Sequence, residues 1–152
     1  MRVTLNGKEA QVSSDLEVGT VADIPASVPP GDQYVVAFVR AERGIFLGRG
    51  RIFLWFEIVA PHEWMEKRLY LCCPEPVGKQ FGLGSKFLAA WMVASGRFPT
   101  RRDRLSTHVF RNKYFRAEVK TVMKDQYGDE RPSIQHYSKV ERLIEVVAGP
   151  QR

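Results

Sequence analysis

The side-chain pattern of residues 51–60 (RIFLWFEIVA) constrains the fold of this chain more than any other feature. One alternate row is wholly apolar, which is typical of a β-strand that buries one face. Dense β-branched and aromatic residues predict further strands at 34–43, 67–73, 109–124 and 137–147, with a break near Asn112. The chain is therefore expected to be mainly β.

Residues 85–96 (SKFLAAWMVASG) are the one segment with a clear helical pattern. Ser85 suits the N-cap because its hydroxyl can accept a backbone N–H, and Gly96 suits the left-handed position after the last turn. The expected element order is then β-β-β-α-β-β. This is the order of the OB-fold, a five-stranded barrel with a helix between strands 3 and 4. Another small barrel or a sandwich is compatible with the same order.

Residues 1–33 differ in character from the rest of the chain. Alternating apolar residues around Asn6-Gly7 predict a hairpin over residues 3–12. The Pro- and Gly-rich stretch 26–32 predicts an extended or flexible lead-in. We therefore expect two regions, a hairpin with a flexible lead-in at 1–33 and an OB-fold domain at 34–148.

The net charge of +6 is unevenly distributed along the chain. Residues 97–124 carry nine basic side chains and two acidic ones, whereas residues 1–33 carry five acidic and two basic ones. A concentrated basic block favours a polyanionic partner, because Lys and Arg neutralise phosphates and release counterions. The alternative interpretation is an ordinary solvated basic face.

The strand patterns also predict which surface would meet nucleic acid. In residues 51–60 the second row mixes charge with large rings, which are costly to expose without a use. Such rings can stack on unpaired bases without regard to sequence, while neighbouring arginines contact phosphates. The alternative is that Phe53 and Trp55 pack under the N-terminal segment or in an oligomer interface. The predicted nucleic-acid-binding residues are Arg51, Phe53, Trp55, Arg68, Tyr70, Arg97, Arg101, Arg102, Arg104, Arg111, Lys113, Arg116 and Lys120.

No residue pattern favours catalysis, a metal or another cofactor. Cys72 and Cys73 are adjacent and cannot form a zinc pair, and the three histidines are far apart in sequence. Carboxylates are scattered, and the glycines at 78–84 lack the phosphate-loop spacing. No apolar run approaches the roughly 18 residues of a spanning helix. We therefore expect a non-catalytic cytoplasmic protein that has no cofactor and does not associate with membranes.

Several segments resemble OB-fold proteins encoded by bacteriophages, plasmids and integrative mobile elements. They are residues 46–59 (FLGRGRIFLWFEIV), 67–70 (KRLY), 102–105 (RDRL), 109–122 (VFRNKYFRAEVKTV) and 137–141 (YSKVE). The resemblance implies a single-stranded DNA-binding protein that aids replication or recombination, with a helicase or polymerase as a candidate partner. Two alternatives stay open, an RNA-binding OB module and a protein-interaction or assembly subunit that uses its aromatic face, as in a homo-oligomer.

Overall fold

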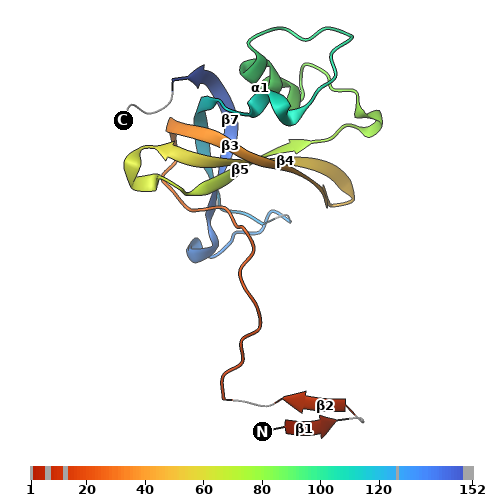
Figure 1. Ribbon diagram of the computed structural model, residues 1–152, viewed down its shortest axis with the longest axis vertical. Helices are drawn as coiled ribbons and strands as arrows, with labels where there is room; N and C mark the ends of the chain where they lie inside the picture. The colour runs from red at the N-terminus through yellow and green to blue at the C-terminus, as the bar shows by residue number, and fades with distance from the viewer. Residues whose placement is uncertain (1, 6–7, 12–13, 126, 149–152) are drawn as a thin grey trace.

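A computed structural model describes residues 2–5, 8–11, 14–125 and 127–148 of the chain (Figure 1). The strands are β1 (Arg2–Leu5), β2 (Lys8–Gln11), β3 (Gly31–Phe46), β4 (Arg49–Ala60), β5 (Arg68–Pro74), β6 (Tyr114–Val122) and β7 (Tyr137–Val147). The helices are α1 (Lys86–Ser95) and four short 3₁₀ helices, η1 (His62–Trp64), η2 (Val77–Lys79), η3 (Thr107–Phe110) and η4 (Ser133–Gln135). The prediction of a mainly β chain with one α-helix between the third and fourth long strands is confirmed.

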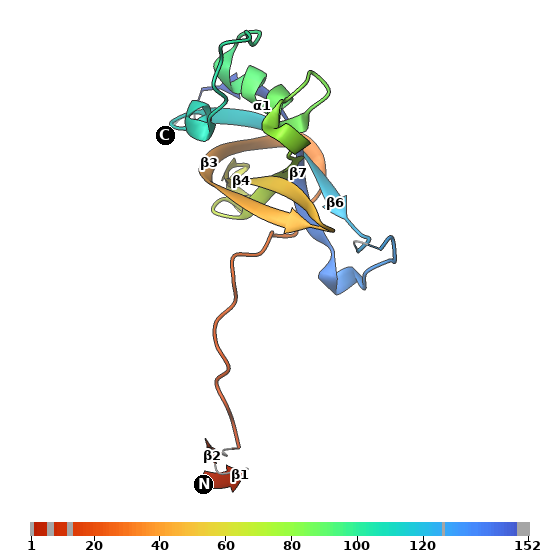
Figure 2. The same ribbon diagram turned by 90° about the vertical axis from the view of Figure 1, so that its right-hand side faces the viewer.

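The five long strands form one antiparallel sheet in the order β5-β4-β3-β6-β7. Figures 1 and 2 show this sheet curving round, so that its outer strands β5 and β7 come to lie beside each other. In the part of the chain that the structure describes, no ladder of backbone hydrogen bonds joins β5 to β7. The sheet is thus strongly curved but not closed. We call the line where these two strands meet the seam.

The alternation in β4 builds the core on the concave side of the sheet. Ile52, Leu54, Phe56 and Ile58 are all buried, as predicted. Phe56 packs edge-on against Phe115 of β6, with ring centroids 6.2 Å apart. Such edge-to-face pairs are the favoured geometry for buried rings. The predicted core row is therefore confirmed.

Two predicted boundaries differ from the observed ones for backbone reasons. β3 covers 31–46 rather than 34–43, and it changes register with β4 between Phe38 and Arg40. A change of register of this kind bends a strand and lets it continue around a curved sheet. The predicted strand 109–124 begins only at Tyr114, because Asn112 has a φ of 59° and η3 precedes it. The predicted break near Asn112 is confirmed.

The predicted helix limits agree with the cap geometry of α1. The Ser85 hydroxyl accepts the Leu88 N–H at 3.2 Å, and Gly96 has a φ of 73° while its N–H donates to the Met92 carbonyl. Both caps satisfy backbone groups that a helix terminus leaves unpaired. The helix buries Phe87 and Trp91 against the sheet, so α1 covers the end of the core near β7.

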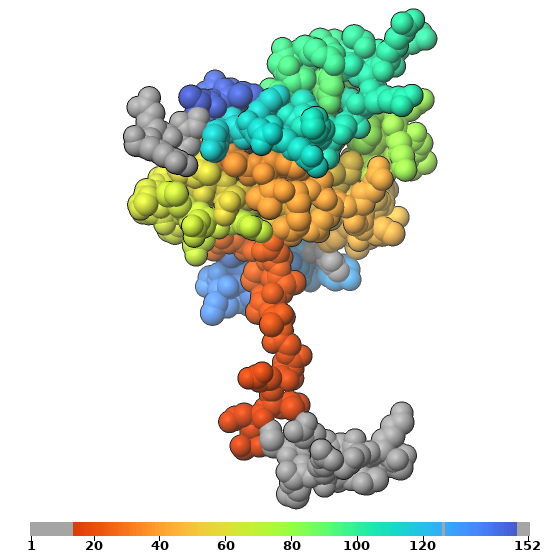
Figure 3. Space-filling model, in the orientation of Figure 1, coloured from red at the N-terminus to blue at the C-terminus, as the bar shows by residue number. Residues whose placement is uncertain are grey.

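The N-terminal region has two parts in the structure. β1 and β2 pair as a separate two-stranded sheet, and the predicted turn residues Asn6 and Gly7 lie outside the described residues. Figure 3 shows the segment that begins at residue 14, coloured red, as a narrow extended stretch outside the body of the protein. Residues 14–24 are exposed throughout.

The last residues before β3 lie in the seam. The Ala26 N–H donates to the Arg68 carbonyl of β5 at 3.0 Å, and the Ala26 carbonyl accepts the Ser138 N–H of β7 at 2.8 Å. The fully buried Ser138 hydroxyl also accepts the Val28 N–H and donates to the Val28 carbonyl. This part of the predicted lead-in is therefore fixed between the two outer strands.

Candidate nucleic-acid interface

Four aromatic side chains form a connected strip on the outer surface of β4, β5 and β7. Tyr70 is the central ring, and its centroid lies 5.2 Å from those of both Phe53 and Trp55 in edge-on contacts. Tyr70 also contacts Tyr137 across the seam at 6.3 Å. The contacts follow from the register, which places Trp55 opposite Tyr70 and Phe53 opposite Cys72. We call these four residues the aromatic strip.

One end of the aromatic strip opens into a hollow of about 450 Å³. Phe46, Phe53, Tyr70 and Tyr137 supply its aromatic lining. Its cationic lining is Arg51, Lys86, Lys124, Arg131 and Lys139, and among the described residues Asp125 is the one carboxylate that lines it. We call this hollow the groove. Rings and cations here share one concave surface, the combination that single-stranded nucleic acid requires.

The two arginines of the groove contact its rings. The Arg51 guanidinium lies 6.0 Å from the Phe46 ring centroid, and that of Arg131 lies 5.5 Å from the Tyr137 ring centroid. The Arg131 side chain also donates to the Lys124 carbonyl at 3.4 Å. Because Arg can stack and donate at the same time, these positions suit both bases and phosphates.

Glu141 moderates the positive charge at the border of the groove. Its carboxylate oxygens lie 3.2 Å from Lys139, 3.8 Å from Lys86 and 3.9 Å from Lys120. Burial opposes ionisation of this carboxyl, but the neighbouring ammonium groups of Lys139, Lys86 and Lys120 lower its pKa below 4.5 overall. Glu141 therefore stays ionised and holds three ammonium groups together.

The Tyr70 hydroxyl is neutral under ordinary conditions. Burial raises its pKa well above the ordinary value of 10.0, and the hydrogen bond to Tyr137 adds to the shift. The Tyr70 hydroxyl donates to the Tyr137 hydroxyl at 3.3 Å. A neutral ring next to cations repels no phosphate, which is what a stacking position needs.

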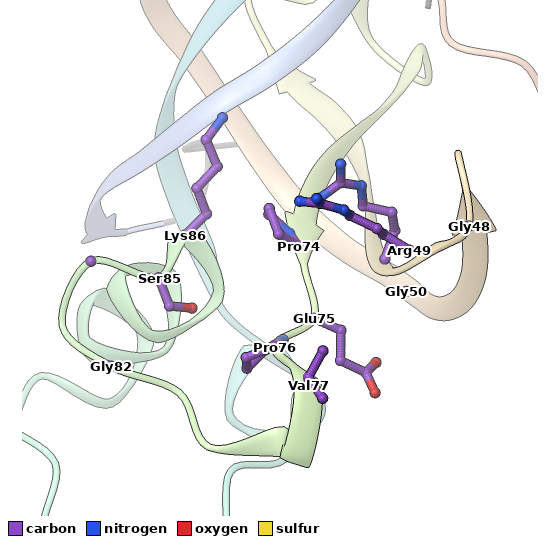
Figure 4. A pocket seen from close by; sticks show the side chains of 12 residues that line it. Gly48, Arg49, Gly50, Pro74, Glu75, Pro76, Val77, Gly82, Ser85 and Lys86 are labelled. Carbon is purple, nitrogen blue, oxygen red and sulfur yellow. The ribbon is translucent and has the colours of Figure 1, made fainter.

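A second hollow of about 720 Å³ continues the groove past Arg51 and Lys86 (Figure 4). The two hollows share Arg51, Pro74 and Lys86 as lining residues. Figure 4 shows Lys86 and Arg49 on either side of Pro74, while Glu75 points away from Lys86. A basic surface thus continues from the groove toward the turn between β3 and β4.

Trp55 differs from its neighbours in the aromatic strip. It is only 5% exposed, so the expectation of an open ring at this position is wrong. The Arg40 guanidinium covers it at 4.8 Å from the ring centroid, and Asp23 of the N-terminal segment pairs with that guanidinium. The physical reason is the Arg40 side chain of the neighbouring strand, and the N-terminal segment, weighed as the alternative cover, reaches this position through the ion pair of Asp23 with Arg40. Phe53 and Tyr70 are only partly buried.

The predicted basic loop 97–104 lies next to α1, whereas the β6–β7 connection that borders the groove lies at the opposite end of the sheet (Figures 1 and 2). Arg97 makes a two-pronged pair with Asp103 at 2.7 and 2.9 Å and lies over the Trp91 ring. Arg101, Arg102 and Arg104 are exposed. The structure therefore does not bring this loop to the groove.

The remaining predicted cations have other neighbours. Lys113 donates to the Ala94 carbonyl at 2.6 Å, and Arg116 pairs with Asp32 and Glu145. Arg111 follows η3 directly and is exposed. Lys120 pairs with Glu141 at the border of the groove and is not among the residues that line it. The predicted residues that line the groove are Arg51, Phe53 and Tyr70. Arg68 lies at the covered end of the strip, where it pairs with Asp23.

Sequence reasoning missed six of the nine rings and cations that line the groove among the described residues. Tyr137 and Lys139 had a usable signal, because they alternate with buried Ser138 and Val140 on the last strand and must face outward. Lys124 and Arg131 belong to the connection between β6 and β7, which reaches the groove only through the folded arrangement. Phe46 and Lys86 likewise come from the ends of other elements.

No family model, no curated protein and no solved structure matches this chain. Among residues 2–5, 8–11, 14–125 and 127–148, no three His, Cys, Asp or Glu side chains gather where they could hold a metal ion. Over the same residues, no helix has the length and apolar character needed to cross a membrane.

Proposed function

We propose that this chain is a non-catalytic module that binds single-stranded nucleic acid, with an OB-fold as its scaffold. Three features support the scaffold: the strand order β5-β4-β3-β6-β7, the meeting of β5 with β7, and the helix between β5 and β6. OB-folds bind oligonucleotides on the face of their second and third strands, between the loops that flank it. The groove occupies the corresponding place on β4 and β5.

The observation that carries the proposal is the groove itself. Its four rings offer flat surfaces to bases, and its five cations outnumber Asp125. Base stacking on an aromatic side chain contributes about 1–3 kcal/mol per base and tolerates any sequence. Duplex nucleic acid hides its base faces, so this surface favours single strands.

The test is fluorescence anisotropy with labelled oligo(dT) and a duplex of equal length. We expect clear binding of oligo(dT), weaker binding of the duplex, and affinity that falls linearly with the logarithm of salt concentration. Phe53→Ala should weaken oligo(dT) binding about 5- to 150-fold, which is the loss of one stacked base. Arg51→Ala should weaken it and reduce the salt slope by about 0.7, because one phosphate contact is lost.

Arg102→Ala is the matched control for Arg51→Ala. It removes the same charge from an exposed arginine outside the groove, so oligo(dT) affinity should change little. Equal affinity for oligo(dT) and duplex, or no affinity for either at low salt, would contradict the proposed function. A loss at Arg102 as large as at Arg51 would instead place the binding surface on the basic loop 97–104.

The chemistry of the groove does not distinguish DNA from RNA, so oligo(rU) belongs in the same assay. The resemblance to proteins of phages and mobile elements supports DNA and a role in replication or recombination.

A second candidate, an assembly subunit, is favoured by the exposed aliphatic side chains Ile45, Leu47 and Val77. Concentration-dependent light scattering that Leu47→Ser abolishes would support self-association through that surface.

A further inference from the structure

Asp23 lies between two guanidinium groups over the covered end of the aromatic strip. Its Oδ2 accepts from Nη1 of Arg40 at 2.8 Å and from Nη1 of Arg68 at 3.2 Å. These arginines come from different strands, β3 and β5, and the Arg40 guanidinium also covers Trp55. One anionic oxygen is thus held by two cations, and one of them, Arg40, lies over the Trp55 ring and also pairs through Nε with Glu42 at 2.6 Å.

Such an arrangement suits a phosphodiester as well as a carboxylate. Guanidinium groups bind both kinds of anion through the same planar donors, and phosphate oxygens accept from two arginines in the same way. The hydrogen bond from Arg40 lowers the pKa of Asp23 below 3.8; desolvation opposes this shift, and the hydrogen bond from Arg68 and the charges of both arginines add to it. The two guanidinium groups therefore favour a negatively charged oxygen at this position.

The residue that occupies this position belongs to an exposed acidic segment. Residues 14–25 contain Asp15, Glu17 and Asp23 and no basic side chain. Ala26 and Val28 are fixed in the seam, whereas residues 14–24 are exposed. Asp23 can therefore leave its two arginines without disturbing the part of the segment that lies in the seam.

The covered ring continues the path of the groove. Trp55 contacts Tyr70 at 5.2 Å, and Tyr70 lines the groove, so a strand that passes Tyr70 meets Trp55 next. The Trp55 Nε1 is buried and has no hydrogen-bond partner among the described residues. A buried donor without a partner is costly, and an acceptor from a bound ligand would satisfy it.

We propose that Arg40, Arg68 and Trp55 form a further nucleotide subsite, with Arg40 and Arg68 as its phosphate clamp, and that Asp23 occupies this clamp in the free protein. Nucleic acid and the acidic N-terminal segment then compete for the same two guanidinium groups. This inference rests on the proposed function of the groove. It adds a nucleotide position beyond the groove.

The test compares the full chain with Asp23→Asn in oligo(dT) binding at two lengths, about 6 and about 20 nucleotides, since OB-folds cover about 4–16 nucleotides. Asp23→Asn should bind the longer oligonucleotide about 3- to 10-fold more tightly, because the clamp no longer holds a competing carboxylate. The salt slope should rise by about 0.7 for the phosphate gained. The shorter oligonucleotide can bind in the groove without reaching the clamp, so its affinity should rise less than that of the longer one.

Two controls separate competition from a general charge effect. Glu17→Gln removes the same charge from the same exposed segment and should leave both affinities unchanged. The gain from Asp23→Asn should disappear in an Arg40→Ala, Arg68→Ala background, because the clamp is then missing. An equal gain from Glu17→Gln, or no gain from Asp23→Asn for the longer oligonucleotide, would overturn the inference while the proposed function stands. Absence of binding to both oligonucleotides would remove the proposed function and the subsite with it.

Discussion

The hydroxyl groups of Tyr70 and Tyr137 lie 3.3 Å apart and connect β5 to β7 on the outside of the sheet. Backbone pairing of the described residues leaves these two strands unjoined, so this side-chain contact is one of the few polar links across the seam. The same two rings line the groove. This pair of residues therefore contributes both to the stability of the seam and to the shape of the groove.

Tyr137→Phe should lower the free energy of unfolding by about 0.5–1.5 kcal/mol, because it removes a hydrogen bond between half-buried groups. The ring remains, so oligo(dT) affinity should change less than with Tyr137→Ala. Urea denaturation and anisotropy measure the two effects separately. Tyr70→Phe combined with Tyr137→Phe should cost less than the sum of the single changes, since both remove one shared bond. If the losses in free energy of unfolding from the two single changes add fully in the double variant, the hydrogen bond contributes nothing to stability.

Ser138→Ala should destabilise the protein by about 1–3 kcal/mol. The Ser138 hydroxyl is fully buried and serves both the N–H and the carbonyl of Val28, so alanine leaves two buried backbone groups unpaired. Ser133→Ala is the matched control because Ser133 is exposed in η4. Chemical denaturation of both variants measures the difference, and equal midpoints would mean that the seam adds nothing to stability.

The two adjacent cysteines should differ sharply in reactivity. Burial raises the pKa of Cys73 to about 12, and it also raises the pKa of the half-buried Cys72, which lines the groove. The thiolate is the reactive form, so at about pH 8 we expect slow alkylation of Cys72 and almost none of Cys73. Both rates should rise with pH, and oligo(dT) should protect Cys72. Peptide mass spectrometry gives the site of modification, and faster reaction at Cys73 would contradict the burial described for it.

Asp103 should stabilise the protein at neutral pH but not in strong acid. The hydrogen bond from Arg97, followed by that from the Thr100 N–H, lowers the pKa of its carboxyl well below 3.8 in the folded state. A lowered pKa in the folded state means that the contribution is complete above the unfolded-state value and declines as pH falls below it. The stability difference between the protein and Asp103→Asn should thus be constant from about pH 8 to 5 and shrink below about pH 4. A stability difference that grows as pH falls would mean that folding raises the pKa of Asp103 instead of lowering it.

Local patterns predicted the elements well because their causes are local. The caps of α1 depend on Ser85 and Gly96 at its two ends, and the alternation in β4 follows from one buried face. The full length of β3 was not predicted, because its continuation around the sheet depends on register shifts against β4 that involve two segments at once.

The candidate site was predicted only in part because its parts are distant in sequence. Arg51, Phe53 and Tyr70 were predicted from strand alternation, and they meet Arg131, Tyr137 and Lys139 in the groove only through the curvature of the sheet. The burial of Trp55 involves Arg40, which lies over the ring and pairs with Asp23, a residue 17 positions earlier in the chain. The many basic residues in 97–124 indicated a positively charged surface, but not where on the folded protein these side chains would lie. The loop before β6 and the strand itself have different surroundings.

The position of Ala26 has a consequence for how the chain can be divided. A polypeptide cut at residue 34 would lose the backbone donor and acceptor that now satisfy Arg68 and Ser138. Exposed strand edges recruit strands from other molecules, so we expect such a fragment to aggregate. The smallest unit that stays monomeric should therefore begin before β3, near residue 23. Its N-terminal limit is set by the residues that lie in the seam and not by the first residue of the first long strand.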